Sequence, residues 1–238
     1  MKISIFGLGY VGVVGAACLA REGHQVIGVD SVQTKADLIN QGLAPIVEKG
    51  LGDLIQKVGR EGRLQATTQA HEAVLETELS LICVGTPSQL NGNLDLGHVR
   101  RVCEQIGGSL KDKAAFHVVA VRSTILPGTM RQVVIPTLED SSGKKLGKDF
   151  GVCYNPEFLR EGSAIFDFEQ PPLTVVGETD LRSGALLGML YANLSAPLIR
   201  TSLEIAEIIK YANNAWHALK ICFANEIGTL CKKMGIDG

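Results

Sequence analysis

The residues best suited to chemistry begin with three glycines and one carboxylate near the start of the chain. Gly7, Gly9 and Gly12 follow one apolar run, and Asp30 closes the next run, about 20 residues after the last glycine. Gly7 permits a tight turn, Gly9 lets a phosphate approach the backbone, and Gly12 lets a helix pack against a strand. The Asp30 carboxylate is suited to accept hydrogen bonds from ribose hydroxyls. This set predicts a dinucleotide-binding site.

The prediction depends on the elements around the glycines, because a lone G-x-G-x-x-G is a weak signal. Residues 2–6 are predicted as a buried strand, 11–21 as a helix and 25–30 as a second strand. The helix opens with free amides near Tyr10 and Val11, where partial positive charge favours phosphate. This order of elements favours dinucleotide binding over a merely structural glycine loop.

Two threonines stand at the ends of later predicted strands. Residues 79–84 and 117–121 are continuous apolar runs, typical of central parallel strands, and Thr86 and Thr124 follow them. Because open α/β sheets bind ligands at the carboxyl ends of strands, both threonines are candidate cofactor contacts. For Thr124, a helix-capping role is an equal alternative. Lys35, on the helix after the acid, is a further candidate, with a solvated lysine as the alternative.

A loop with several charges follows the predicted strand at residues 150–154. It reads Asn-Pro-Glu-Phe-Leu-Arg-Glu-Gly and carries Glu157, Arg160 and Glu161. Charged residues on such loops are more often functional than those on helix faces. The two glutamates are therefore candidates for proton transfer or for holding a water molecule.

Residues 202–234 are predicted as one long helix, because they contain no proline and a single interior glycine. At about 100° per residue, six side chains form an apolar face: Ile208, Ala212, Ala215, Leu219, Phe223 and Leu230. Four polar side chains lie on the other side: Lys210, Asn214, His217 and Asn225. The alternative for these four is an ordinary exposed polar face. A length of roughly 45 Å favours a domain connector or a dimer strut.

The remaining pattern alternates between strands and helices. Further helices are predicted at residues 34–41, 48–58, 71–76, 95–110 and 180–193, with another from 127, and further strands at 64–67, 173–177 and 197–200. Residues 140–149 are predicted as a surface loop. This alternation predicts an α/β fold, a Rossmann-like doubly wound and mainly parallel sheet. We expect residues 1–200 to form the nucleotide-binding domain and 201–238 the long helix.

Composition excludes several classes of protein. The 238 residues carry a net charge of −2, which gives no reason to expect nucleic acid or an anionic membrane as a partner. There is no signal peptide and no apolar stretch of transmembrane length. The six cysteines contain no C-x-x-C pair, and most of them lie in apolar runs, which indicates buried thiols in a reducing, cytoplasmic location. No metal site is predicted.

Five motifs occur in a fixed order along the whole chain: 6–12, 84–87, 123–124 with 127–129, 155–162, and Lys210 with Asn214. With them the sequence resembles the nucleotide-sugar 6-dehydrogenases, the UDP-glucose and GDP-mannose dehydrogenase family. Residues 126–129, 216–220 and 223–228 resemble the GDP-mannose branch, and UDP-glucose enzymes tend to differ at His217.

The resemblance implies a four-electron oxidation of the sugar C6 alcohol to a uronic acid, a precursor of alginate-type polysaccharides, with reduction of two NAD⁺. It assigns the NAD contacts to Tyr10, Val11, Asp30, Lys35, Thr86 and Thr124. It assigns the nucleotide-sugar contacts to Glu161, Lys210, Asn214, His217 and Asn225. Glu161, Lys210 and Asn214 are the implied catalytic residues, since a cation and an amide one helical turn apart suit negative charge on the C6 oxygen. The long helix is implied to form a homodimer.

One feature departs from the family. The family's nucleophilic cysteine lies in a glycine-rich Cys-Leu-Pro-Lys segment, and none of the six cysteines here has those neighbours. The second sugar-binding domain is also absent, so we expect little activity from these 238 residues alone. Three alternatives stay open: a UDP-glucose 6-dehydrogenase, a β-hydroxyacid dehydrogenase, or a non-catalytic NAD-binding and dimerisation module. The loop at 155–158 and His217 argue against the β-hydroxyacid enzyme.

Overall fold

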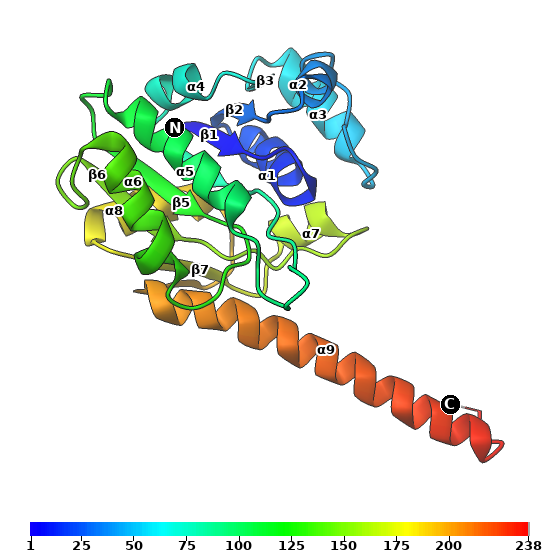
Figure 1. The fold of residues 1–238 in the computed structure, drawn as a ribbon. Coiled ribbons are helices and arrows are strands. Elements are labelled where there is room, and N and C mark those ends of the chain that lie inside the picture. Colours follow the sequence, from blue (N-terminus) through cyan, green and yellow to red (C-terminus); the bar gives the residue numbers. More distant parts are fainter. Residues whose placement is uncertain (238) are drawn as a thin grey trace.

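The computed structural model describes residues 1–237, and within them a single sheet forms the centre of the molecule (Figure 1). Its strands lie in the order β3-β2-β1-β4-β5-β6-β7-β8. Neighbouring strands are parallel except β6 and β7, which are antiparallel. The strands are β1 (Lys2–Phe6), β2 (Gln25–Val29), β3 (Leu64–Thr67), β4 (Leu79–Ile82), β5 (His117–Val121), β6 (Phe150–Tyr154), β7 (Thr174–Glu178) and β8 (Leu198–Ser202). The predicted fold class is confirmed.

Helices cover both faces of the sheet, because successive strand residues point to opposite sides. Ile3 and Ile5 of β1 join one hydrophobic core, and Phe6 joins the other. The first core contains residues of α1 (Tyr10–Arg21), α2 (Gln33–Asn40), α3 (Leu51–Arg60), α7 (Ala164–Glu169) and α8 (Leu181–Gly188). The second contains residues of α4 (Ala70–Glu76), α5 (Gly97–Leu110), α6 (Ile135–Ser142) and the start of α9 (Leu203–Lys233).

Near the first core, one predicted helix boundary was wrong and one short helix was missed. Helix α3 begins at Leu51 rather than at Glu48, because Gly50 adopts a left-handed conformation with φ +77° that a helix cannot include. The chain before Gly50 therefore stays irregular and leaves Glu48 free for tertiary contacts. Helix α7 was not predicted, since six residues are too few to give a helical period.

In the second half of the chain, two helices end at other residues than the sequence predicts. Helix α6 continues to Ser142, into the stretch predicted as a loop, and it follows a π-helical turn at Met130–Val134. The helix predicted to reach residue 193 ends at Gly188, and a 3-10 turn continues to Tyr191. Helix ends fray and tighten in this way, so sequence periodicity places them only within a few residues.

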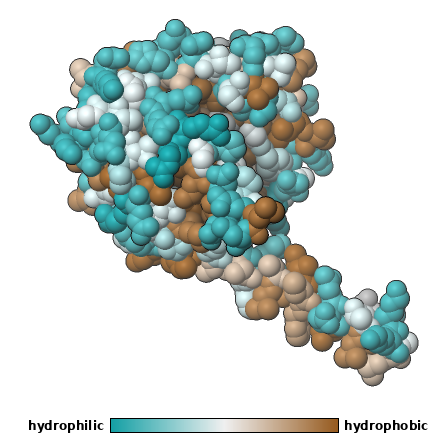
Figure 2. Space-filling view, in the orientation of Figure 1, coloured by the Kyte–Doolittle hydropathy of each residue, from teal (hydrophilic) through white to brown (hydrophobic). Residues whose placement is uncertain are grey.

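Helix α9 leaves the body of the protein after its first two turns (Figure 1). Ser202 caps its start by accepting a hydrogen bond from the Ile205 amide. Leu203 and Ala206 are buried against the second core, whereas the residues after Tyr211 are mostly exposed. Figure 2 shows hydrophobic residues along the projecting part of the helix. None of the helices in the described part of the chain combines the length and apolar character that crossing a bilayer requires.

Candidate functional site

The turn after β1 is built by glycines, and two of them are required by the protein itself. Gly7 has φ +94°, and its amide donates to the Val29 carbonyl at 2.7 Å. A Cβ on Gly12 would lie 1.8 Å from the Gly7 carbonyl oxygen, so no other residue fits there. Gly9 differs, because its φ is −80° and a Cβ there would meet no heavy atom within 4 Å. Packing leaves open space at Gly9, which fits a phosphate approaching the backbone.

The start of α1 faces this open space. Its first helical hydrogen bond runs from the Val13 amide to the Gly9 carbonyl at 2.9 Å. The amides of Tyr10 and Val11 therefore precede the hydrogen-bonded ladder, at the end of the helix that carries partial positive charge. Tyr10 and Val11 thus supply unpaired amides beside Gly9, which is the feature for which the sequence analysis named them.

Asp30 lies just beyond β2 and is 9% exposed. Its Oδ2 accepts hydrogen bonds from the Leu8 amide at 2.7 Å and from Lys35 Nζ at 3.1 Å, and its Oδ1 accepts one from the Val32 amide at 3.0 Å. Burial alone would raise the pKa of Asp30, but the two amides and the Lys35 ammonium lower it overall. Asp30 is thus an anion at neutral pH, with lone pairs left to accept from a ribose.

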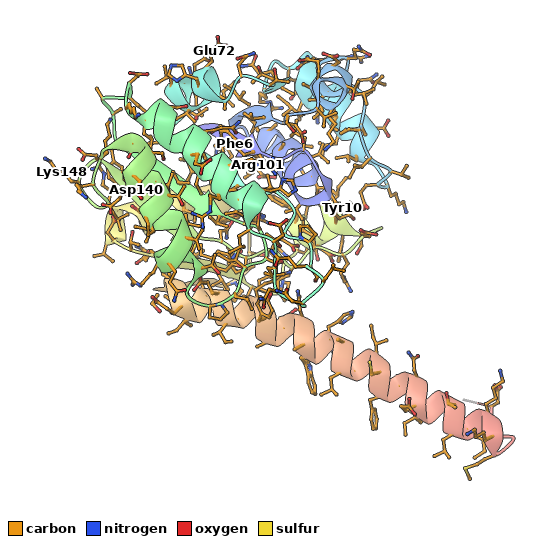
Figure 3. The ribbon with its side chains drawn as sticks, viewed as in Figure 1. Phe6, Tyr10, Glu72, Arg101, Asp140 and Lys148 are labelled. Carbon is orange, nitrogen blue, oxygen red and sulfur yellow. The ribbon has the colours of Figure 1, made fainter. Side chains whose placement is uncertain are left out.

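A cleft of about 660 Å³ runs between the carboxyl ends of β1 and β2 and the side of α5. Gly7, Gly9, Asp30 and Lys35 line one side of it. The opposite wall contains side chains that the sequence analysis missed: His98, Arg101 and Gln105 of α5. Figure 3 shows Arg101 on α5 near the Phe6 end of β1. The spacing of three and four residues was a readable signal, since it puts all three on one helical face.

The ends of β4 and β5 bring the two predicted threonines together. The Thr86 hydroxyl donates to the Thr124 carbonyl at 2.7 Å, and the Ser123 hydroxyl donates to the Val84 carbonyl at 2.6 Å. The next helical segment starts only at Met130, so Thr124 is not a helix cap. Both threonines lie half-buried at the same edge of the sheet.

Lys210 and Glu157 form a shielded ion pair where β6 meets α9. Lys210 Nζ donates to Glu157 Oε1 at 2.9 Å and to the Glu157 carbonyl at 2.6 Å. Lys210 is only 5% exposed, and its ammonium lies 5.4 Å from the centre of the Phe158 ring. The alternative of an ordinary solvated polar face is therefore wrong for Lys210. An ammonium has three donors, so one donor remains for a ligand.

Glu161 lies outside the cleft, on the loop after β6, which is held in place by hydrogen bonds of its neighbour Arg160. Its neighbour Arg160 binds Asp167 through the amide at 2.9 Å and through the guanidinium at 2.6 Å. The Glu161 side chain itself is exposed. The loop's left-handed turn at Gly162 has φ +87°, which favours glycine at that position.

The other predicted sugar contacts lie on the exposed part of α9. Asn214 is one turn beyond Lys210, and His217 and Asn225 follow further along the projecting helix. At 1.5 Å per residue, Asn225 lies roughly 22 Å from Lys210 along the axis. A single chain therefore brings Lys210 and Asn214 together but leaves Asn225 far from both.

A buried arginine was missed by the sequence analysis although it stands beside Thr124. Arg122 Nη1 donates to Asn155 Oδ1 at 2.7 Å and to the Tyr191 hydroxyl at 2.6 Å. It lines a cavity of about 20 Å³ together with Glu157. Arg122 is thus a buried positive charge that shares this cavity with Glu157.

The cysteines divide between the core and α9. Burial raises the pKa of the thiols of Cys18, Cys83 and Cys103 to about 12, and it also raises the pKa of Cys153. Neutral thiols are poor nucleophiles, so these four are structural. Of the two cysteines on α9, Cys222 is exposed and Cys231 is half-buried. No cluster of three histidine, cysteine or carboxylate side chains placed for a metal occurs within residues 1–237.

Comparison with known proteins gives two family matches that together span most of the chain. Residues 1–195 match the NAD binding domain of the UDP-glucose/GDP-mannose dehydrogenase family, and residues 204–238 match the central domain of the same family.

The GDP-mannose 6-dehydrogenases of Azotobacter vinelandii and Pseudomonas aeruginosa are each 58% identical over 238 residues, covering 100% of this chain and 55% of each relative. The UDP-glucose 6-dehydrogenase AglM of Haloferax volcanii is 39% identical over 242 residues, covering 100% of this chain and 56% of the relative. The chain thus spans about half the length of the curated relatives it matches.

Solved structures give the same result. The crystal structure of a ternary complex of GDP-mannose dehydrogenase from Pseudomonas aeruginosa matches with a TM-score of 0.98 and 57% identity, covering 100% of this chain and 54% of that one. A UDP-glucose dehydrogenase from Pyrobaculum islandicum matches with a TM-score of 0.94 and 40% identity, covering 99% of this chain and 54% of that one.

Proposed function

Because the chain belongs to the UDP-glucose/GDP-mannose dehydrogenase family and contains its NAD-binding domain, we propose that the whole protein oxidises GDP-mannose at C6 to GDP-mannuronate. The product would be a precursor of an alginate-type polysaccharide. The observation that carries the proposal is the order of the site residues along one edge of the sheet. The greater identity to GDP-mannose 6-dehydrogenases, 58% against 39% for the UDP-glucose enzyme AglM, favours the GDP-mannose reaction.

The site residues follow the order of strands β2, β1, β4, β5 and β6. Asp30 and Lys35 would hold the adenosine ribose, the amides of Tyr10 and Val11 the pyrophosphate, and Thr86 and Thr124 the nicotinamide end. Glu157 follows β6, the next strand in the sheet. This order supports an extended dinucleotide whose reactive end lies beside the Lys210–Glu157 pair. Bound NAD⁺ would supply the hydride acceptor.

Lys210 is proposed to stabilise negative charge on the C6 oxygen. Glu157 accepts two of the three hydrogen bonds that the ammonium can donate, which fixes the ammonium and leaves one donor for the ligand. Asn214, one helical turn further on, would donate from its amide to the same oxygen. Glu161, exposed on its anchored loop, would accept the proton or hold a water molecule.

The polar stripe of α9 is proposed to hold the rest of the nucleotide sugar. Glu161, Lys210 and Asn214 would contact the sugar, whereas His217 and Asn225 would contact the more distant part of the nucleotide. The extent of the stripe, roughly 22 Å along the helix, supports an elongated ligand rather than a small hydroxyacid.

The protein is further proposed to be a homodimer through α9. Apolar side chains on the projecting helix support this, with Leu219 60% and Phe223 65% exposed in the single chain. We also propose a division into a nucleotide-binding domain at residues 1–200 and a connecting helix from 201, supported by the two family matches. The free thiols at all six cysteines support a reducing, cytoplasmic location.

The test of the function is NADH production by the full gene product, followed by absorbance. We expect two NADH per GDP-mannose and a rate with UDP-glucose at least about tenfold lower, equivalent to about 1.4 kcal/mol of discrimination. Lys210→Ala should lower the rate by about a hundredfold or more. Equal rates with both nucleotide sugars would contradict the assignment of the substrate, and no NADH with any nucleotide sugar would contradict the reaction.

A further inference from the structure

Glu48 attaches the start of α1 to the loop that carries Glu161. Its Oε2 accepts hydrogen bonds from the Tyr10 hydroxyl at 2.6 Å and from the Gly162 amide at 2.8 Å. Its Oε1 accepts one from the Ala164 amide at 3.1 Å. Glu48 thus contacts α1 and the loop at once, although both are far from it in sequence.

The Tyr10 hydroxyl makes the second half of this connection. The hydroxyl has one proton, which it donates to Glu48 at the shorter distance. The Arg160 carbonyl lies 3.1 Å away as a second, weaker acceptor for that proton, and the Gly162 amide donates to the hydroxyl oxygen at 3.2 Å. The backbone groups immediately before and after Glu161 therefore both lie within hydrogen-bond distance of the Tyr10 hydroxyl, and the Gly162 amide also donates to Glu48. Tyr10 and Glu48 thus contact the backbone on both sides of Glu161, whereas the Glu161 side chain is exposed.

The connection is charge-assisted at neutral pH. The hydrogen bond from Tyr10 lowers the pKa of Glu48, and the amides of Gly162 and Ala164 lower it further. The acceptor is therefore a carboxylate, and hydrogen bonds to a charged acceptor are stronger than neutral ones. The far end of the same loop is fixed by Glu157, through its ion pair with Lys210.

We propose that Glu48 is a positioning residue that couples occupation of the cofactor site to the placement of Glu161, with Tyr10 as the shared link. The Tyr10 amide is one of the unpaired amides at the start of α1, proposed above to hold the pyrophosphate, and its hydroxyl donates to Glu48. A ligand bound at the Tyr10 amide restricts the motion of Tyr10, and this reduces the conformational entropy that is lost when the loop at 160–164 becomes ordered. By thermodynamic linkage, an ordered loop would in turn favour binding of the ligand. This inference rests on the roles proposed above for Tyr10 and Glu161.

Hydrogen exchange of the amides at 160–164, measured on the whole protein with and without saturating NAD⁺, tests the coupling. In the wild type, NAD⁺ should slow exchange in this segment by about tenfold. Glu48→Ala should abolish this NAD⁺-dependent slowing and weaken NAD⁺ binding by about threefold to tenfold. Glu48→Gln, which keeps an acceptor oxygen, should restore part of both. A merely structural role would alter exchange equally with and without NAD⁺.

Two further variants keep the test decisive if Glu48→Ala proves poorly folded. Tyr10→Phe removes the hydroxyl and keeps both the ring and the backbone amide, so it should show the same loss of NAD⁺ dependence in a folded protein. Glu72→Gln alters an exposed carboxylate on α4, remote from the loop (Figure 3), and should change neither readout.

Two results would overturn the proposal. If NAD⁺ binds the wild type without changing exchange at 160–164, the coupling is wrong while the cofactor assignment stands. If Tyr10→Phe keeps the full NAD⁺-dependent slowing, Tyr10 is not the link. Failure of the wild type to bind NAD⁺ at all would instead overturn the proposed function, and the coupling with it.

Discussion

Single residues decide which nucleotide the cleft accepts. Asp30 is an anion held by two amides and Lys35, and a 2′-phosphate would bring a charge of about −1.5 to −2 against it. We therefore expect calorimetric titration to give an affinity for NAD⁺ at least about tenfold above that for NADP⁺. Asp30→Ser should narrow this difference, whereas Asp37→Ser, an exposed carboxylate on α2, should not. Equal affinities in the wild type would contradict the assignment.

The Lys210–Glu157 pair should matter for stability as well as for reaction. Both side chains are shielded, so Lys210→Met leaves the Glu157 carboxylate unpaired away from water. We expect the free energy of unfolding in urea to fall by about 3 kcal/mol. The double variant Lys210→Met/Glu157→Gln should recover part of the loss, because no uncompensated charge remains. Lys148→Met, at an exposed lysine, serves as the control and should change stability by less than about 0.5 kcal/mol.

At the scale of the elements, β4 and β5 share a buried histidine that makes the sheet sensitive to acid. His117 Nδ1 donates to the Thr77 carbonyl at 3.1 Å, so Nε2 accepts from the Ser80 hydroxyl at 2.8 Å. Burial, aided by the charge of Lys113, lowers the pKa of His117 to about 3. The folded protein therefore keeps this imidazole neutral where the unfolded chain would protonate it.

The sign of the pH dependence follows from this depressed pKa. The stabilisation is present above the ordinary histidine pKa of about 6.5 and is lost as pH falls from there toward 3, by roughly 1 kcal/mol per pH unit. Urea unfolding between pH 7.5 and 4 measures it, and His117→Gln should flatten the profile relative to the wild type. His71→Gln, at an exposed histidine, should leave the slope unchanged. Identical slopes for wild type and His117→Gln would refute this account.

At the scale of the whole molecule, the projecting part of α9 exposes large apolar side chains that a second copy of the chain would bury. Burying a large apolar side chain is worth about 1.5–3 kcal/mol, and several such side chains lie in water in the single chain. We expect light scattering to report a dimer, and Leu219→Glu to give monomers or aggregates. His217→Ala removes a polar group and should leave assembly intact. A stable wild-type monomer at micromolar concentration would contradict the proposed interface.

The sequence by itself determined the local parts of this protein. The Gly7–Gly12 turn, the apolar runs of β4 and β5 and the long helix α9 follow from residue types within a few positions of one another, which is the range over which periodicity and turn chemistry act. The order of strand, glycines, helix and acid then specified the half of the sheet that carries Asp30. Local patterns also placed the two threonines, because they stand directly after buried strands.

Only the tertiary structure decided how distant residues meet. Glu48 left its predicted helix to bind Gly162, 114 positions away, and Lys210 became buried through Glu157, 53 positions away. The spacing of His98, Arg101 and Gln105 puts them on one face of α5, but only the packing of α5 beside β1 and β2 makes that face a wall of the cleft. The short helix α7 likewise forms against its neighbours, because six residues give no period of their own. Such contacts depend on the order of strands in the sheet and on side-chain packing between layers. The spacing of residues along the chain specifies neither the strand order nor this packing, so local patterns cannot predict which distant residues meet.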